Sequence, residues 1–396
     1  MNNQNINSIG PVGLDASASE KAVTDHASSD CSRPAWIEID LAALRHNIAV
    51  IRSKIGPVAR LMAVVKANAY GHGAVRISKV ASEEGVDYLG VALLEEADEI
   101  HNAGIKTPIV ILYPENVPRA IEAIRKGYII TVSETAMPER LSVIMGTRDI
   151  PIRYFLKLNT GMNRYGIRIK NNSELFDSIP TGYGFEFLGF MTNLAGSNGA
   201  DTPLSLKQEK TFCELMKCAE ERFGDSIYLS YESSGSLSKK NGARGTLLRI
   251  GHLMYGSLNA EESEYKPVMS VKSRIAEIKD VIKGEGVGYG FSFIARKNTR
   301  IAVIPMGYAD GYPWSLSNKG HILVNGQIAR IAGRVCMDAF MVDITDLGKC
   351  KIGDEVVVMG PMGDRKICAH TLGKLAGSFS YEIMSRWSRR LPRIYK

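Results

Sequence analysis

The feature that most constrains the fold is an alternation of short apolar runs with segments of helical spacing, which continues over roughly 220 residues. Each run is typical of a buried strand, and each following segment is typical of an amphipathic helix. About eight such repeats predict a parallel sheet that helical crossovers close into a (β/α)8 TIM-type barrel. An open doubly wound sheet is the alternative, but it would need a glycine-rich phosphate turn after its first strand, and the sequence has none. We expect the strands at residues 36–40, 61–65, 88–93, 108–113, 128–133, 152–159, 185–193 and 227–233.

A second pattern replaces this alternation after Gly256. β-Branched residues now alternate with polar ones, and turn signals such as Asn325-Gly326 separate the runs, which predicts an all-β domain. The start of the chain is rich in Asn, Ser, Ala and Gly, which bury little apolar surface. We therefore expect a disordered N-terminal extension at residues 1–32, a (β/α)8 barrel at 33–262 and a C-terminal β-strand domain at 263–396.

Composition excludes several classes of protein. The net charge of +7 arises from Lys and Arg scattered among Asp and Glu, without the basic stripe of a nucleic-acid-binding protein. No segment approaches the ~18 apolar residues of a membrane span, and the N-terminus does not resemble a secretory signal. None of the six cysteines stands in a C-x-x-C pattern and none of the seven histidines has metal-ligand spacing. These observations predict a reduced, cytoplasmic protein without a metal site.

Lys66 stands where the apolar run 61–65 ends and the sequence Tyr70-Gly71-His72-Gly73 follows. A buried ammonium is costly unless it is paired or gives up its proton. A lysine with a lowered pKa is what Schiff-base chemistry with a carbonyl cofactor requires. The alternative is a lysine whose stem lies along the strand end while its charge stays in water, and this motif alone does not separate the two.

Several longer motifs give the chain a resemblance to a known family. They are VVKANAYGHG, LKLNTGMNRYG, LLRIGHLMYG, GVGYGFSF, MGYADGYP, GRVCMD and SYEI. In this order and at these positions they resemble the alanine racemases over roughly residues 34–396. The resemblance implies a pyridoxal 5'-phosphate enzyme with a barrel and a β-domain, which acts as a homodimer on a small amino acid and has active sites shared between subunits.

The resemblance implies two catalytic bases. Lys66 matches the lysine that holds the cofactor covalently, and its freed amine exchanges the substrate Cα proton on one face. Tyr289 matches the tyrosine that acts on the other face and that the partner subunit supplies. Two bases are needed because a single base would tend to return the proton to the side it left. A free tyrosine titrates near ~10, so Tyr289 needs help to act as a base at neutral pH.

The remaining site residues are also implied by the resemblance. Arg249 matches the arginine that faces the pyridine nitrogen, and a guanidinium does not accept a proton there. Arg164 matches the arginine that binds the substrate carboxylate, Lys157 a lysine that is often carbamylated, and Met337 a partner residue that offers its backbone amide. The phosphate-binding matches are Tyr70, Ser234, Gly251, His252 and Tyr381, and the matches at the substrate entrance are Tyr308, Trp314 and Arg334.

Three departures from the family pattern bear on specificity. Asn193 stands at the cofactor-binding position where the family usually has a histidine stacked on the ring, Trp314 replaces a common arginine, and residues 378–380 read SFS before Tyr381. The principal interpretation is a racemase of alanine that supplies D-alanine as a peptidoglycan precursor or takes part in its catabolism. A racemase of serine, lysine or arginine is the first alternative. A non-catalytic pyridoxal-phosphate-binding barrel is the second, although such proteins generally lack the β-domain tyrosine.

Overall fold

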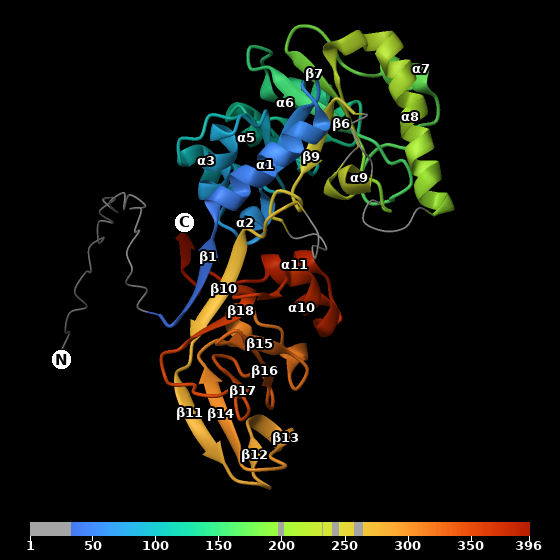
Figure 1. The fold of residues 1–396 in the computed structure, drawn as a ribbon. Helices are drawn as coiled ribbons and strands as arrows, with labels where there is room; N and C mark the ends of the chain where they lie inside the picture. The colour runs from blue at the N-terminus through green and yellow to red at the C-terminus, as the bar shows by residue number, and fades with distance from the viewer. Residues whose placement is uncertain (1–32, 197–201, 232, 240–244, 257–263) are drawn as a thin grey trace, which may run out of the picture.

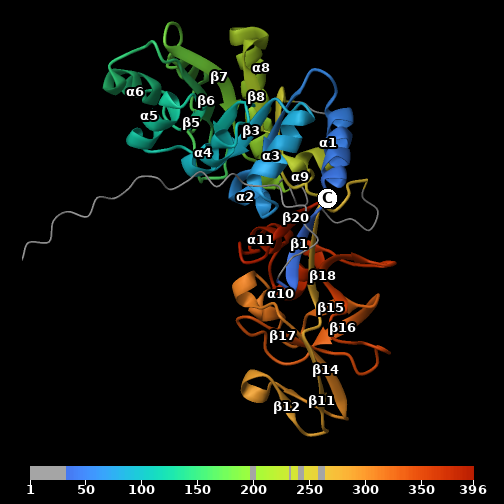
Figure 2. The same ribbon diagram turned by 90° about the vertical axis from the view of Figure 1, so that its left-hand side faces the viewer.

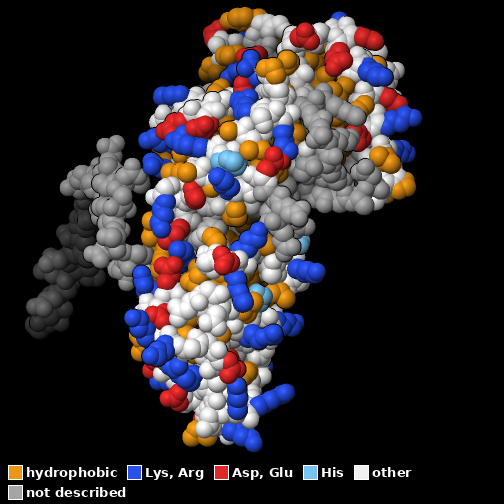
Figure 3. All heavy atoms as spheres, viewed as in Figure 1, with side chains coloured by type: hydrophobic (Ala, Val, Ile, Leu, Met, Phe, Trp, Pro, Cys, Tyr) orange, Lys and Arg blue, Asp and Glu red, His pale blue; other side chains and the backbone are white. Residues whose placement is uncertain are grey.

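The computed structural model describes residues 33–196, 202–231, 233–239, 245–256 and 264–396. Two domains lie end to end, with the helix-rich domain above the β-rich domain in the view of Figure 1. Lys and Arg side chains are interspersed with Asp and Glu over the face shown in Figure 3, as the sequence predicts. The predicted extension at 1–32 lies outside the described residues.

The upper domain is a closed barrel of eight parallel strands among the described residues. Strand β3 pairs with β2 and with β4, strands β5, β6, β7 and β8 pair in chain order, and β9 pairs with β2, all of them parallel. Single parallel bridges, Val110 to Ile129 and Ser233 to Arg249, close the two remaining seams. The predicted (β/α)8 barrel is therefore confirmed. The strands are β2 Arg60–Val64, β3 Tyr88–Val91, β4 Ile109–Ile111, β5 Ile130–Val132, β6 Ile152–Lys157, β7 Phe185–Met191, β8 Tyr228–Ser230 and β9 Leu247–Ile250.

Helices cover the outside of the barrel and begin at residues suited to their ends. Asp40 accepts a hydrogen bond from the Ala43 amide at 2.8 Å, which caps the first helix, and Asn116 accepts one from the Arg119 amide at 3.2 Å. Glycine at position 56 ends the first helix with a φ of 76°. The helices are α1 Leu41–Ile55, α2 Lys66–Tyr70, α3 Ala74–Glu83, α4 Leu94–Asn102, α5 Val117–Arg125, α6 Met137–Met145, α7 Asn172–Asp177, α8 Pro203–Phe223 and α9 Ser234–Lys239.

The lower domain is built on a large, mostly antiparallel sheet with the order β11-β14-β17-β16-β15-β18-β10-β1-β20, and β19 pairs with β18. A separate two-stranded ribbon, β12 with β13, lies at the end of this domain that is far from the barrel in both Figure 1 and Figure 2. The elements are β1 Ala35–Ile39, β10 Met269–Arg274, β11 Glu277–Val281, β12 Gly286–Val287, β13 Phe293–Ile294, β14 Thr299–Ile304, β15 His321–Val324, β16 Gln327–Ile331, β17 Phe340–Asp343, β18 Glu355–Met362, β19 Arg365–Ile367, α10 Ala369–Ala376, α11 Ser380–Ser385 and β20 Arg393–Tyr395.

The first strand differs from the prediction in its place. β1 pairs antiparallel with β10 and parallel with β20, so it belongs to the sheet of the lower domain although residues from 33 onward were assigned to the barrel. The eighth barrel strand is β9, in the LLRIGH segment. An apolar run predicts a strand but does not say which sheet the strand will join. The described part of the chain therefore starts in the lower domain, continues through the barrel, and ends in the lower domain again.

Side chains fill the barrel interior, as is usual for this fold. A cluster that includes Met62, Val110, Phe155 and Met191 occupies the interior. At the amino end of the strands the Tyr88 and Tyr228 hydroxyls are 3.3 Å apart. Space for a ligand therefore remains at the carboxyl ends of the strands. Within the described ranges, no helix is long and apolar enough to cross a membrane.

Candidate active site

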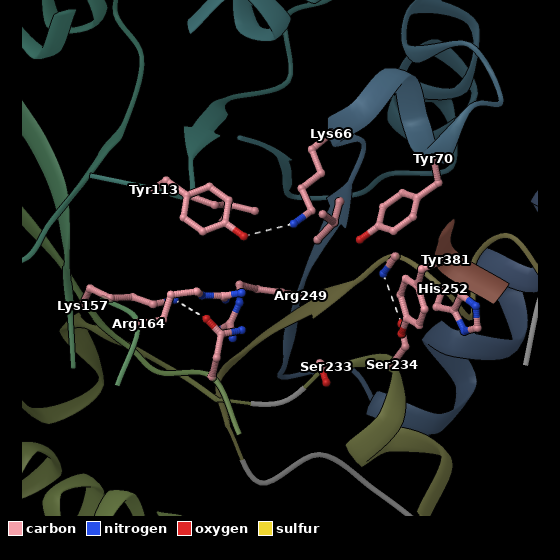
Figure 4. A pocket seen from close by; sticks show the side chains of 14 residues that line it. Lys66, Tyr70, Tyr113, Lys157, Arg164, Ser233, Ser234, Arg249, His252 and Tyr381 are labelled. Atoms are coloured by element: carbon pink, nitrogen blue, oxygen red, sulfur yellow. Dashed lines mark hydrogen bonds between the residues drawn. The ribbon is translucent and has the colours of Figure 1, made fainter. Parts of the chain in front are cut away.

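A pocket of about 160 Å³ lies at the carboxyl ends of the barrel strands and is completed by α11 of the lower domain (Figure 4). Figure 4 shows two ends of the pocket, one with Lys157 and Arg164 and the other with Tyr70 and Tyr381, and Lys66 lies between them. The structure brings ten of the predicted residues together here. The pocket is lined by Val64, Lys66, Tyr70, Leu112, Tyr113, Lys157, Arg164, Asn193, Ser233, Ser234, Arg249, Gly251, His252 and Tyr381.

Lys66 is followed by an unusual backbone. The four residues Ala67 to Tyr70 all have positive φ, between 51° and 54°, so they form a left-handed helical turn. Such a conformation costs roughly 1–2 kcal/mol for each residue other than glycine. Glu96 of α4 offsets part of this cost, because its carboxylate accepts hydrogen bonds from the Ala67 amide at 2.6 Å and the Ala92 amide at 2.8 Å. The turn directs both Lys66 and Tyr70 into the pocket (Figure 4).

The glycines after this turn allow the C-terminal segment to approach closely. A Cβ on Gly71, which has a φ of 85°, would lie 2.4 Å from the Met384 carbonyl oxygen. A Cβ on Gly73 would lie 1.9 Å from the Tyr395 hydroxyl oxygen. A side chain at either position would therefore clash with α11 or β20, which explains why glycine occurs on both sides of His72.

One end of the pocket gathers groups suited to an anion. The Ser234 hydroxyl accepts hydrogen bonds from the Gly251 and Leu253 amides, each at 3.2 Å. A Cβ on Gly251 would lie 2.9 Å from the Tyr70 hydroxyl oxygen, so only glycine leaves this approach open. Tyr381 lies on the same side, with its ring centre 5.9 Å from that of Tyr70. Backbone amides and hydroxyls converging at loops on this face of a barrel suit a phosphate.

Two buried histidines lie behind this end. The ring of His252 stacks on Tyr381 at 3.9 Å, and its Nε2 is 3.0 Å from the Ser380 hydroxyl. Burial, with a smaller effect of His72, lowers the pKa of His252 to about 3. Burial also lowers the pKa of His72 to about 4, and the Nδ1 of this ring is 2.8 Å from the Ala69 carbonyl oxygen. Both rings are therefore neutral at physiological pH and position neighbouring groups.

Arg249 is buried at the centre of the pocket and is held by three oxygens. Its guanidinium donates to the Ser230 carbonyl at 2.9 Å, to the Ser230 hydroxyl at 2.5 Å and to the Thr192 carbonyl at 2.6 Å. None of the described residues that line the pocket is Asp or Glu. Four basic side chains, Lys66, Lys157, Arg164 and Arg249, thus face a pocket whose described lining contains no carboxylate. An anionic ligand would complement them.

Lys157, at the end of β6, is 5% exposed and donates to the side-chain oxygen of Asn193 at 2.5 Å. Burial, followed by the nearby charges of Arg249, Arg164 and Lys66, lowers the pKa of Lys157 well below its ordinary value. A neutral amine is the form that reacts with carbon dioxide, but carbamylation of Lys157 stays a prediction. Asn193 therefore contacts Lys157 directly and gives it a neutral partner.

Four lining residues were not predicted, namely Val64, Leu112, Tyr113 and Ser233. Tyr113 is the one that contacts Lys66. Its hydroxyl accepts a hydrogen bond from Lys66 Nζ at 3.3 Å, and its ring lies 5.5 Å from the Arg164 guanidinium carbon. The available signal was its place at the carboxyl end of the predicted strand 108–113, where barrel sites gather.

Five predicted residues lie outside this pocket, because they belong to the lower domain. Tyr289 follows β12 at the end of that domain away from the barrel (Figures 1 and 2). Hydrogen bonds join the loops that carry Tyr308, Trp314, Arg334 and Met337. The Tyr308 amide donates to the Cys336 carbonyl at 3.0 Å, and the Val335 amide donates to the Ser317 hydroxyl at 3.0 Å. With Phe291 they form an exposed group, which we call the β-domain patch. It consists of Tyr289, Phe291, Tyr308, Trp314, Arg334 and Met337.

The sequence matches a known family on both domains. Residues 39–259 match the alanine racemase N-terminal domain, and residues 268–395 match the alanine racemase C-terminal domain. The chain belongs to the alanine racemase family.

Individual relatives agree with this assignment. The chain is 34% identical over 369 residues to alanine racemase 2 of Caldanaerobacter subterraneus subsp. tengcongensis, covering 92% of this chain and 95% of that protein. It is also 34% identical over 372 residues to the alanine racemase of Halothermothrix orenii, covering 92% and 97%. Among solved structures, the alanine racemase of Bacillus anthracis with bound L-Ala-P has a TM-score of 0.83 at 32% identity, covering 92% of this chain and 95% of that one.

As a member of the alanine racemase family, the protein is an isomerase that depends on pyridoxal phosphate, and the pocket fits this cofactor. Lys66 would supply the amine for a covalent bond to it, and the group around Ser234 and Gly251 would hold its phosphate. Arg249 stands where the ring would be held, between these two ends. In the described part of the chain, no three His, Cys, Asp or Glu side chains gather to hold a metal ion.

Proposed function

We propose that this alanine racemase interconverts L- and D-alanine with Lys66 of one subunit and the partner's Tyr289 as the two bases. The observation that carries the proposal is the separation of these residues: Lys66 lies in the pocket, whereas Tyr289 lies at the far end of the lower domain of the same chain. A chain on its own thus offers one base to its pocket. A second chain can supply the other.

The chemistry that pyridoxal phosphate supplies when bound is electron withdrawal from Cα of an amino acid, which makes the Cα proton removable. The residues of the chain then orient and exchange that proton. Arg164 binds the substrate carboxylate, because its planar fork suits two carboxylate oxygens. The Lys66 amine takes or returns the proton on one face, and the partner's Tyr289 does so on the other. Arg249 would place a guanidinium, and not a carboxylate, beside the ring nitrogen. The nitrogen would then stay largely unprotonated, which favours proton exchange over side reactions.

Two exposed apolar surfaces support a homodimer. The β-domain patch includes Tyr289 and Phe291, which are 72% and 67% exposed. A second surface, the barrel-mouth patch, is a set of exposed apolar residues on the barrel domain. It consists of Met162, Tyr165, Leu204 and Leu206, of which Tyr165 packs on the pocket residue Tyr113. In a two-fold dimer the β-domain patch of each subunit would cover the barrel-mouth patch of its partner, which places Tyr289, Met337 and the entrance residues at both sites.

The proposal is tested by deuterium exchange at Cα in heavy water, with L-alanine and D-alanine as separate substrates. The wild-type holoenzyme should incorporate deuterium while forming the opposite enantiomer. Tyr289→Phe should abolish exchange on one face, since phenylalanine keeps the ring and lacks the base. Racemisation by Tyr289→Phe at the wild-type rate would contradict the assigned role. A protein that binds the cofactor yet exchanges no proton would be the non-catalytic alternative.

Asn193 and Trp314 support a second candidate, a racemase of serine, lysine or arginine. Asn193 contacts Lys157 inside the pocket, and Trp314 is 56% exposed in the β-domain patch, where it would narrow the entrance. The same exchange experiment with a panel of L-amino acids ranks the substrates. We expect alanine to have the largest kcat/KM, and an amino acid that exceeds it would replace alanine in the proposal.

We infer that the reaction takes place in the cytoplasm and supplies D-alanine for peptidoglycan. None of the five described cysteines, Cys213, Cys218, Cys336, Cys350 and Cys368, forms a disulfide, as expected in a reducing compartment. Depletion of the protein in cells should create a requirement for external D-alanine. Growth that is indifferent to D-alanine would favour a catabolic role.

A further inference from the structure

Tyr113 stands between the two functional groups that must act together on the substrate. Its hydroxyl oxygen lies 3.3 Å from Lys66 Nζ, which donates to it. The same nitrogen lies 5.2 Å from the centre of the Tyr113 ring. One side chain thus contacts the Lys66 amine through both its hydroxyl and its ring (Figure 4).

The ring of Tyr113 also contacts the carboxylate-binding arginine. The Arg164 guanidinium carbon lies 5.5 Å from the ring centre, within the range of a cation–π contact. Arg164 is solvent-exposed and its side chain has many rotamers, so it needs a surface that fixes its direction. Tyr165 packs on the Tyr113 ring at 5.3 Å between centres and thereby supports that surface.

The hydroxyl contact concerns the state in which Lys66 acts as a base. A lysine that is covalently bonded to the cofactor has no free amine, whereas the amine that exchanges a proton must be free and must stay in reach of Cα. A long flexible stem disperses such an amine unless something holds it. The Tyr113 hydroxyl is the described acceptor that the free amine meets in this structure.

We propose that Tyr113 is a positioning residue of this racemase: its hydroxyl holds the free Lys66 amine, and its ring holds Arg164. The inference rests on the proposed function of the site. It assigns to one side chain the alignment of the base with the group that binds the substrate carboxylate. The hydroxyl and the ring have separate tasks, so two substitutions should separate them.

Tyr113→Phe keeps the ring and removes the hydroxyl. We expect kcat for alanine to fall about five- to tenfold, the effect of losing one net hydrogen bond, with KM changed by less than about twofold. Tyr113→Leu removes the ring as well, so KM should also rise severalfold as Arg164 loses its support. The matched control is Tyr183→Phe, because Tyr183 is 72% exposed and its hydroxyl donates to Asp149 at 2.7 Å, away from the pocket.

A second readout needs no turnover. Cofactor-free wild-type protein and Tyr113→Phe are mixed with pyridoxal phosphate, and formation of the covalent bond at Lys66 is followed by absorbance. A held amine reacts faster than a dispersed one, so Tyr113→Phe should take up the cofactor severalfold more slowly and reach the same final content. Three results for Tyr113→Phe would each overturn the proposal: an unchanged rate of cofactor uptake, an unchanged kcat, or a rise in KM as large as the fall in kcat. Failure of the wild type to racemise alanine would instead refute the proposed function, and the uptake comparison would still report on Tyr113.

Discussion

At the scale of single residues, His252 and His72 make the anion-binding end of the pocket sensitive to acid. Both are buried and neutral, with pKa values lowered to about 3 and about 4, mainly by burial. In the unfolded chain a histidine titrates near ~6.5. Between these values the unfolded state binds more protons than the folded state, so stability falls as the pH is lowered through 6.5.

His252→Gln should therefore reduce the acid sensitivity of folding. From pH 7 to pH 5 one such histidine lowers the free energy of unfolding by about 2 kcal/mol, and the variant should lose about that much less than the wild type. Denaturant titrations at both pH values measure the difference. His370→Gln, at an exposed position on α10, is the control. Equal losses in His252→Gln and the wild type would mean that His252 is not held neutral.

The sequence predicted much of the site at this scale, because motifs specify the residues that touch a cofactor. It missed Tyr113, which stands before Pro114 in a segment without a glycine motif or a basic residue. It also could not show that Asn193 would bond to Lys157. Lys157 ends β6 and Asn193 follows β7, and the register between these two strands, which places the residues side by side, is not written in either segment.

At the scale of elements, the left-handed turn after Lys66 stores conformational strain where the reactive lysine leaves its strand. Ala67 is exposed, so its Cβ makes the strain without contributing to the core. Ala67→Gly should raise the free energy of unfolding by about 1 kcal/mol, because glycine adopts positive φ without this penalty. Ala49→Gly, at an exposed position inside the right-handed helix α1, should lower it by about 1 kcal/mol. Denaturant titration of both variants measures the sign of each change in the free energy of unfolding. A lower free energy of unfolding in Ala67→Gly would show that the turn is not strained at Ala67.

Element types were predicted more reliably than their partners. The run at 36–40 is a strand, as its pattern indicates, but it pairs with β10 and β20 of the lower domain. The eighth barrel strand is β9, a short segment of four residues around Arg249. Local periodicity specifies that a segment is a strand. Its neighbours in the sheet depend on segments far along the chain, such as β10 and β20 for β1.

At the scale of the whole molecule, we propose that each active site combines the barrel of one subunit with the β-domain patch of its partner. Lys66→Ala and Tyr289→Phe should each be nearly inactive alone. In a heterodimer of the two, one site carries both defects, and the other has Lys66 from one subunit and Tyr289 from its partner.

Mixing the two variant subunits therefore distinguishes a shared active site from one that a single chain builds. The two variants are coexpressed in equal amounts, and alanine racemisation is measured against each variant alone and against the wild type. Random pairing gives half heterodimers with one intact site each, so the mixture should recover about a quarter of wild-type activity. A mixture no more active than the average of the two variants would show that both bases come from the same chain.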